Sequence, residues 1–311
     1  MKKNHELIQL EICQRRGIEL DYEANKRLIN LRKGFEGEYT VFEWFQKFSH
    51  GQINIVTDYW FYHGKYMQVD LLVLLSNRWI VVEVKNYFGK FEYRHHECYL
   101  NGKLMSDNHI NQLAHRTKRI QHIANELNSS IKIESIMVFI DEHCEVDIQS
   151  DIPMKVIQRN QLRAYISSLV NEQRNESQVI SLNKMLNHLE KYRAESPFQP
   201  MLFEPCHLEN RIRNGISCFN CHSFDTTVAK KLVSCRQCGY KAYKKQVVIN
   251  AALELRYIYY YDTSKITNAA IFEYCGGLIS SRTISSAMSS HFMLVSKGTR
   301  SYYDVPLKYI E

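Results

Sequence analysis

The stretch from Gln68 to Asn86, QVDLLVLLSNRWIVVEVKN, constrains the fold more than any other part of the chain. It predicts two buried β-strands joined by a polar turn at residues 76–78. The strands are apolar except for Asp70 in the first and Glu83 and Lys85 in the second. Side chains alternate between the two faces of a strand, so Glu83 and Lys85 project from the same face. Burying such charges costs several kcal/mol unless they are paired or bind a metal, and this predicts a functional site.

The charged positions belong to a wider motif. An Asp on one strand followed by Glu-x-Lys on the next resembles the PD-(D/E)xK nuclease signature, and the whole pattern is similar to the NERD (nuclease-related) domain of bacterial proteins. The matching residues are Gly34, Gly37 and Glu38 in GFEGE, Gln68 and Asp70 in QVD, Glu83, Lys85 and Asn86 in VEVKN, and Gly89. The resemblance implies an α/β restriction-endonuclease-like core, a mixed sheet flanked by helices over residues 33–160, that hydrolyses phosphodiester bonds.

The same resemblance implies the residues of an active site. Asp70 and Glu83 would bind one or two Mg²⁺ or Mn²⁺ ions with help from the Val84 carbonyl, since oxygen ligands suit these ions. Lys85 would orient the attacking water and offset negative charge at the phosphate. Glu38 would be a third metal-facing acid. Its alternative role is to complement the dipole of a helix that we expect to begin near residue 35.

A long helix is predicted from Asp107 to about Asn128 by its apolar periodicity. In the resembling family a polar residue on this helix contributes to the active cleft, usually after an Asn-Pro pair. This chain has Asn108-His109 at that point. Gln112 is therefore a candidate catalytic residue, with an exposed polar position on the helix as the alternative.

Apolar periodicity also predicts the other elements up to residue 192. A helical segment over residues 1–32, broken near Gly17, is expected to pack on the nuclease core. The remaining predictions are a hairpin of residues 89–95 and 98–105 with a turn at Asn101-Gly102, strands at 133–140 and 154–158, and helices at 160–170 and 179–192. Ser196 to Pro200, with Pro205 close behind, predicts a linker that closes a connector of residues 161–205.

Four cysteines in two C-x-x-C pairs predict a zinc ribbon over residues 206–245. The pairs are Cys218 with Cys221 and Cys235 with Cys238, and thirteen residues separate them. Four thiolates leave no open position for water, so the ion would be structural. Two disulfides or four free thiols are the alternatives. Three further side chains, Cys206, His207 and His222, lie nearby, but the complete quartet does not need them.

Positive charge is concentrated in the last third of the chain. Residues 206–311 hold 14 Lys and Arg against 7 Asp and Glu, whereas residues 1–205 hold 26 of each. Basic and aromatic residues follow the cysteine pairs closely, which suits phosphate neutralisation and base stacking. Residues 246–311 predict three helices and a hairpin, an order that resembles a winged helix. A small helical cap with a hairpin is the alternative.

The favoured function is a cytoplasmic, metal-dependent nuclease that acts on DNA rather than RNA. No run of 18 apolar residues is present and the first 20 residues carry charges, so no membrane span or secretory signal is expected. Two alternatives stay open. One is a nucleic-acid-binding or regulatory protein that keeps the nuclease fold without cleavage. The other is a scaffold whose C-terminal region binds protein partners, and a homo-oligomer is compatible with all three.

Overall fold

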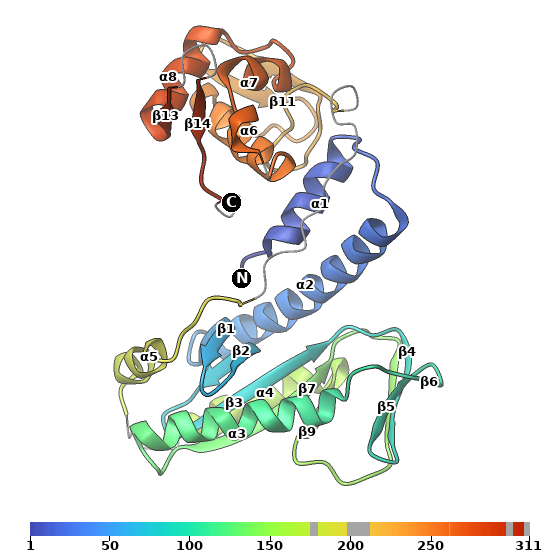
Figure 1. The fold of residues 1–311 in the computed structure, drawn as a ribbon. Helices are drawn as coiled ribbons and strands as arrows, with labels where there is room; N and C mark the ends of the chain where they lie inside the picture. Colours follow the sequence, from blue (N-terminus) through green and yellow to red (C-terminus); the bar gives the residue numbers. More distant parts are fainter. Residues whose placement is uncertain (175–179, 198–211, 261, 297–300, 308–311) are drawn as a thin grey trace. The chain divides into compact units, whose positions relative to one another are not determined.

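The computed structural model describes residues 1–174, 180–197, 212–260, 262–296 and 301–307 (Figure 1). The chain divides into two compact units. Unit 1 comprises residues 32–199, and unit 2 joins residues 2–31 to residues 200–311. Most of the predicted linker, and with it Cys206 and His207, lies outside the described residues. Within those residues, no helix is both long and apolar enough to span a membrane.

Unit 1 is built on a five-stranded mixed sheet with the strand order β1-β2-β3-β7-β9. Its strands are β1 (Asn54–Tyr62), β2 (Tyr66–Leu74), β3 (Arg78–Lys85), β7 (Lys132–Phe139) and β9 (Lys155–Gln158). The first three pair antiparallel, as the stretch around the 76–78 turn predicted, while β3, β7 and β9 run parallel. The predicted mixed sheet is confirmed.

Helices cover both faces of this sheet. The helices are α2 (Tyr22–Ser49), α3 (His109–Leu127), α4 (Arg159–Arg174) and α5 (Leu182–Glu190). Apolar residues of α2 and α4 pack on one face, and those of α3 and α5 pack on the other. Trp79 and Val81 of β3 belong to the core that α3 covers. Strand alternation therefore places Glu83 and Lys85 on the α3 face as well.

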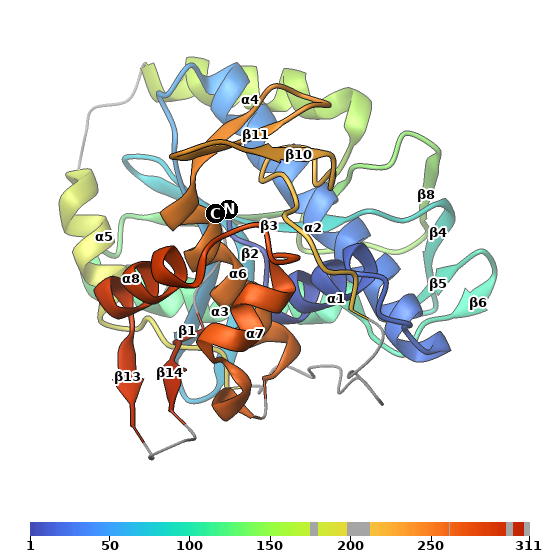
Figure 2. The ribbon, with the colours of Figure 1, turned by 90° about the horizontal axis from the view of Figure 1, so that it is seen from above.

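A smaller sheet lies beyond the carboxyl end of β3 (Figures 1 and 2). It has the order β6-β5-β4-β8 and comprises β4 (Gly89–Arg94), β5 (Glu97–Leu100), β6 (Lys103–Leu104) and β8 (Cys144–Ile148). The predicted single hairpin is wrong in detail, because the chain turns twice. His95 and His96 form the first turn and Asn101-Gly102 the second, all four with positive φ. Sequence periodicity had not indicated β8.

The helix that carries the GFEGE motif begins thirteen residues earlier than expected. α2 runs without interruption from Tyr22 to Ser49, so Glu38 lies in its middle and the helix-dipole role is excluded. Close packing against Asn86 requires a glycine at position 37 of this helix. A Cβ at Gly37 would lie 2.8 Å from the Cβ of Asn86. The Asn86 amide donates to the Lys33 carbonyl oxygen at 2.7 Å, so the helix packs directly against the end of β3.

In its described residues, unit 2 contains a three-stranded ribbon, four α-helices, the short 3-10 helix η2 (Thr263–Lys265) and a hairpin. The elements are α1 (His5–Arg15), β10 (Thr226–Val228), β11 (Leu232–Cys235), β12 (Lys241–Tyr243), α6 (Lys244–Ile258), α7 (Asn268–Tyr274), α8 (Ser281–His291), β13 (Met293–Val295) and β14 (Tyr302–Asp304). Figure 2 shows β13 and β14 side by side after α8. The order of three helices and a hairpin is the predicted one. The winged-helix assignment itself stays a prediction.

The expectation that the first helix packs on the nuclease core is wrong. α1 packs on α6, with Ile8 and Ile12 in the same apolar core as Val248. Polar contacts follow the same path, because Gln9 donates to the carbonyl oxygen of Tyr257 at 3.0 Å. Periodicity shows that a helix has an apolar face but not which distant element covers that face.

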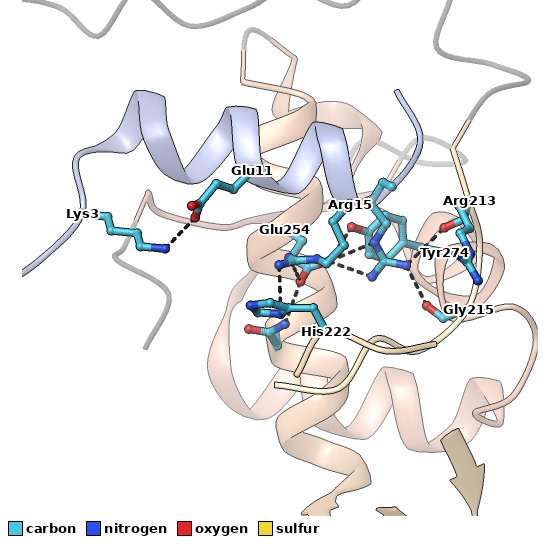
Figure 3. A network of polar contacts seen from close by, with 10 residues as sticks. Lys3, Glu11, Arg15, Arg213, Gly215, His222, Glu254 and Tyr274 are labelled. Carbon is cyan, nitrogen blue, oxygen red and sulfur yellow. Dashed lines mark hydrogen bonds and ion pairs between the residues drawn. The ribbon is translucent and has the colours of Figure 1, made fainter. Parts of the chain in front are cut away.

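A buried carboxylate ties these helices together (Figure 3). Glu254 on α6 accepts hydrogen bonds from Arg15 at 2.7 Å, from Arg16 at 2.7 Å and from the Tyr274 hydroxyl at 2.6 Å. Arg15 also contacts Nδ1 of His222, next to the first cysteine pair, at 3.1 Å. The network joins α1, α6, α7 and the cysteine ribbon within unit 2.

Candidate active site and cysteine cluster

The two central strands bring three predicted site residues together. The Asp70 carboxylate accepts the Val84 N–H at 2.8 Å, which holds it against β3. The Lys85 ammonium pairs with Oε1 of Glu83 at 2.8 Å. Because these residues stand on adjacent antiparallel strands and project to the α3 face, two acids and a lysine share one part of the sheet surface.

Glu38 approaches the same cluster from α2. Burial raises the pKa of Glu38 to about 7, with the negative charges of Asp58 and Glu83 adding to the effect. Asp58 was not identified from the sequence. It lies on β1 between Thr57 and Tyr59, whose partners on β2 are the two neighbours of Asp70. Its φ of 48° is unusual for a strand residue. Its carboxylate accepts a hydrogen bond from the Gln68 side-chain amide at 2.7 Å, so the first residue of the QVD motif is a hydrogen-bond partner of Asp58.

Glu83 is the most tightly paired acid of the cluster. Burial alone would raise its pKa, but Lys85 and Arg116 outweigh burial and hold the pKa of Glu83 below its usual value. Arg116, on α3, pairs with the second carboxylate oxygen. Sequence reasoning missed Arg116. The available signal was its position four residues after Gln112, which puts both side chains on one face of the helix.

Gln112 lies in a separate polar group on α3. Its amide donates to Asp107 at 3.0 Å, and its side chain lies beside His109. His109 Nε2 in turn meets the Tyr87 hydroxyl at 2.8 Å. Burial lowers the pKa of His109, and the nearby Lys85 ammonium lowers it further. The group therefore adjoins Lys85, and the role of Gln112 stays a prediction.

The donor set fits a divalent cation. Burial raises the pKa of Asp70 well above its usual value, and the charges of Glu83 and Glu38 raise it further. The carboxylates thus repel one another, and a cation between them would relieve this repulsion. Among the described residues, only the four cysteines bring three or more ligand atoms of His, Cys, Asp or Glu close together, within 4.8 Å of one another. The carboxylates of Asp70, Glu83 and Glu38 are therefore more widely spaced than the cysteine sulfurs.

The cysteine quartet is assembled as the spacing predicted. The four sulfur atoms of Cys218, Cys221, Cys235 and Cys238 lie within 4.8 Å of one another and form no disulfide. Gly239 follows with a φ of 75°, the left-handed conformation that a tight turn after the second pair needs. Four thiolates converging on one point suit a tetrahedral ion, and zinc is the ion that such structural sites bind.

Basic and aromatic side chains surround this cluster. The exposed ones are Lys230, Lys231, Arg236, Lys241, Lys245, Tyr240 and Tyr243, with Lys244, Phe219 and Phe224 half-buried. One cation is engaged within the ribbon, where Arg236 lies 3.5 Å from Asp225. The others give the ribbon a positive surface with accessible rings.

The fold and these sites describe a nuclease-type domain followed by a cysteine-ribbon region. Comparison with protein families supports the first part, because residues 33–140 match the family described as the nuclease-related domain, NERD. This stretch is therefore a nuclease-related domain. It covers about a third of the chain and contains Glu38, Asp70, Glu83, Lys85 and Gln112.

Comparison with whole proteins adds less. No curated protein matches the chain. Among solved structures, the small subunit of a heterodimeric restriction endonuclease is similar at 15% identity, over 55% of this chain and 84% of that subunit. The TM-score of this comparison is 0.25.

Proposed function

We propose that the protein is a Mg²⁺- or Mn²⁺-dependent deoxyribonuclease. One observation carries the proposal. Asp70, Glu83 and Lys85 stand together on the β2–β3 pair of a domain that belongs to a nuclease-related family. Buried acids beside a lysine suit hydrolysis of a phosphodiester, where negative charge must be held and stabilised.

The roles of the side chains follow from their contacts. Asp70, Glu83, Glu38 and the Val84 carbonyl would hold the catalytic ion. When bound, the ion would act as a Lewis acid that stabilises charge on the phosphate. Lys85 is fixed by Glu83, so its ammonium is oriented to bind the attacking water or a phosphate oxygen. Asp70 is fixed by the Val84 N–H, which leaves its second oxygen available.

Unit 2 would supply nucleic-acid contact. We propose that the cysteine quartet binds a structural zinc ion and that the surrounding lysines and tyrosines hold DNA by phosphate contacts and stacking. The predicted winged helix would add α8 and the β13–β14 hairpin to this surface. Binding through phosphates should weaken strongly with salt.

The test is cleavage of linear, circular and single-stranded DNA and of RNA, each with Mg²⁺, Mn²⁺ or EDTA. Lys85→Ala and Glu83→Gln should each lower the rate by about 10²–10³-fold, the scale for losing one electrostatic contact to the transition state. Lys103→Ala, at an exposed position on β6, is the matched control and should cleave normally. Equal cleavage by all four proteins would contradict the proposal.

A non-cleaving nucleic-acid-binding protein is the second candidate, and one observation favours it. Both carboxylate oxygens of Glu83 are engaged by cationic side chains. If these pairs persist with Mg²⁺ and DNA present, Glu83 is not available to the ion. Salt-sensitive DNA binding with no cleavage under any metal condition would support this candidate.

A further inference from the structure

Arg116 is a cationic side chain of the site that the proposed function leaves without a task. It projects from α3 to one oxygen of Glu83, while Lys85 takes the other. The core residues Leu113 and Ile120 bracket Arg116 on α3 and are fully buried, which fixes the position of its Cα. A guanidinium has five donors, so pairing with Glu83 leaves donors available for a second anion.

Exposure increases through this cluster from Glu83 to Arg116. The exposed fractions of the side chains are 6% for Glu83, 13% for Lys85 and 23% for Arg116. Arg116 is therefore the member of the three that a ligand from solvent would meet most readily. Its long stem allows the head group to move while the helix stays in place.

The two partners of Glu83 differ in how they are attached. Lys85 stands two residues from Glu83 on the same strand, so the strand keeps them together. Arg116 reaches Glu83 from a different element. When Glu83 turns to a divalent cation, the contact from α3 is the easier one to give up.

On the basis of the proposed function, we propose that Arg116 is the phosphate-binding residue of the site. Glu83 holds the Arg116 guanidinium until the Glu83 carboxylate binds a divalent cation. Released from Glu83, the planar guanidinium contacts two oxygens of one phosphate, a geometry that a lysine does not reproduce. Metal binding and phosphate binding are thus coupled through one side chain, and no bond is made or broken in the exchange.

The first measurement is Mn²⁺ binding to the full-length protein without nucleic acid, followed by electron paramagnetic resonance. Arg116→Ala should bind Mn²⁺ about tenfold more tightly, because no charge-assisted contact to Glu83 has to be broken and a nearby positive charge is gone. Arg119→Ala, which removes a guanidinium one turn further along the same helix, should bind Mn²⁺ as the unmodified protein does.

The second measurement is the affinity for a short phosphorothioate DNA duplex with and without Mn²⁺. The unmodified protein and Arg119→Ala should gain about tenfold or more in duplex affinity from Mn²⁺, and Arg116→Ala should lose most of this gain. Arg116→Lys keeps one positive charge and should retain part of it. A thermal melt of each variant establishes that it is folded.

The two measurements separate this proposal from the nuclease proposal. If Arg116→Ala binds Mn²⁺ no more tightly, or if its Mn²⁺-dependent gain in duplex affinity is unchanged, the role of Arg116 is overturned, whether or not the protein cleaves DNA. If both effects appear but the unmodified protein cleaves no nucleic acid, the role of Arg116 stands and the nuclease activity is rejected.

Discussion

Glu254 in unit 2 and Glu83 in unit 1 are both buried glutamates that pair with two cationic side chains. Their surroundings differ. The Glu254 side chain is 2% exposed and its partner Arg16 is 3% exposed, and the Tyr274 hydroxyl completes the set. Burial would raise the pKa of Glu254, but Arg16 and Arg15 outweigh it and lower that pKa. With one carboxylate and two guanidinium groups, this network has no acid in excess.

Around Glu83 the three acids outnumber the two cationic side chains. Asp70 and Glu38 add negative charge, and both have raised pKa values because burial and neighbouring carboxylates disfavour ionisation. A closed ion-pair network is what a structural role requires, while acids left in excess suit a site that takes up a cation. The comparison teaches that the pairing around a buried acid, more than its burial, separates the two roles.

The largest expected effect tests whether metal has a structural role in unit 2 alone. Removing zinc should abolish hydrogen-exchange protection of residues 218–243, because structural zinc contributes about 10–16 kcal/mol in small zinc domains. Removing Mg²⁺ should leave protection in unit 1 unchanged. Exchange followed by mass spectrometry resolves both regions. If residues 218–243 stay protected from exchange without zinc, the metal has no structural role in unit 2 and the contrast with unit 1 is lost.

The next effect separates activity from stability at Glu83. Glu83→Gln should lower the cleavage rate by about 10²–10³-fold while changing the unfolding free energy of unit 1 by less than about 2 kcal/mol, because Asp70 and Glu38 remain to pair with the cations. Single-turnover kinetics and urea denaturation measure the two quantities. Unfolding of unit 1 in this variant would assign Glu83 a structural role.

Glu254→Gln should show the reverse. Removing the charge leaves Arg16 buried without its carboxylate, so unit 2 should lose about 3–5 kcal/mol of unfolding free energy. Exchange protection of α1 and α6 reports this loss. Glu11→Gln, which removes a half-buried partner of Lys3 on α1, should cost about 1 kcal/mol or less. Similar losses in both variants would contradict a special role for Glu254.

Gly37 offers a smaller test of how the site is positioned. Gly37→Ala should destabilise unit 1 by about 1–3 kcal/mol, since its methyl group would overlap Asn86 and displace the neighbouring Glu38. Gly34→Ala lies on the same helix with no atom within 4 Å of the added carbon, and should stabilise by about 0.5–1 kcal/mol. Thermal denaturation of the pair gives both values, and effects of the same sign would contradict the packing argument.

The smallest expected effect is a difference in pH dependence. Folded protein holds the Glu38 proton up to about pH 7 against an ordinary pKa of 4.5, so this group lowers the stability of unit 1 as pH rises through that window. Asp70 acts in the same direction. The lowered pKa of Glu254 stabilises unit 2 above about pH 4.5, and that contribution is lost as pH falls below it.

Urea denaturation between pH 3 and pH 8 measures these dependences. In Glu38→Gln the decline of unit 1 stability between pH 4.5 and pH 7 should be smaller than in the unmodified protein. In Glu254→Gln, unit 2 should lose less unfolding free energy as the pH falls below about 4.5. Unchanged pH profiles in both variants would contradict the assignment of these pKa shifts to Glu38 and Glu254.

Local pattern was sufficient to predict β2 and β3 and their charged residues. Alternation with a period of two located Asp70, Glu83 and Lys85 on a sheet surface, and cysteine spacing located the ribbon. Arg116 was missed despite its spacing from Gln112, because an arginine on an amphipathic helix normally faces solvent and its partner lies 33 residues away. Asp58 escaped because only the fold shows its left-handed backbone.

Helix boundaries and partners were the other failures. A helix was expected to begin near residue 35, yet α2 begins at Tyr22 and continues through Gly34 and Gly37. At Gly37, close packing on Asn86 offsets the low helix propensity of glycine. The apolar face of α1 was visible in the sequence, while its partner α6 lies more than 200 residues away. Contacts of such sequence separation leave no local signature.

The pairing of α1 with α6 has a consequence for synthesis on the ribosome. At about 5–20 residues per second, residues 5–15 emerge well before residues 244–258 exist. Residues 32–199 have their own core and can fold in that interval, whereas the first helix waits with Ile8 and Ile12 uncovered. Residues 32–199 can therefore fold before residues 5–15 find their partner. During translation, this first helix is a segment for chaperones to shield.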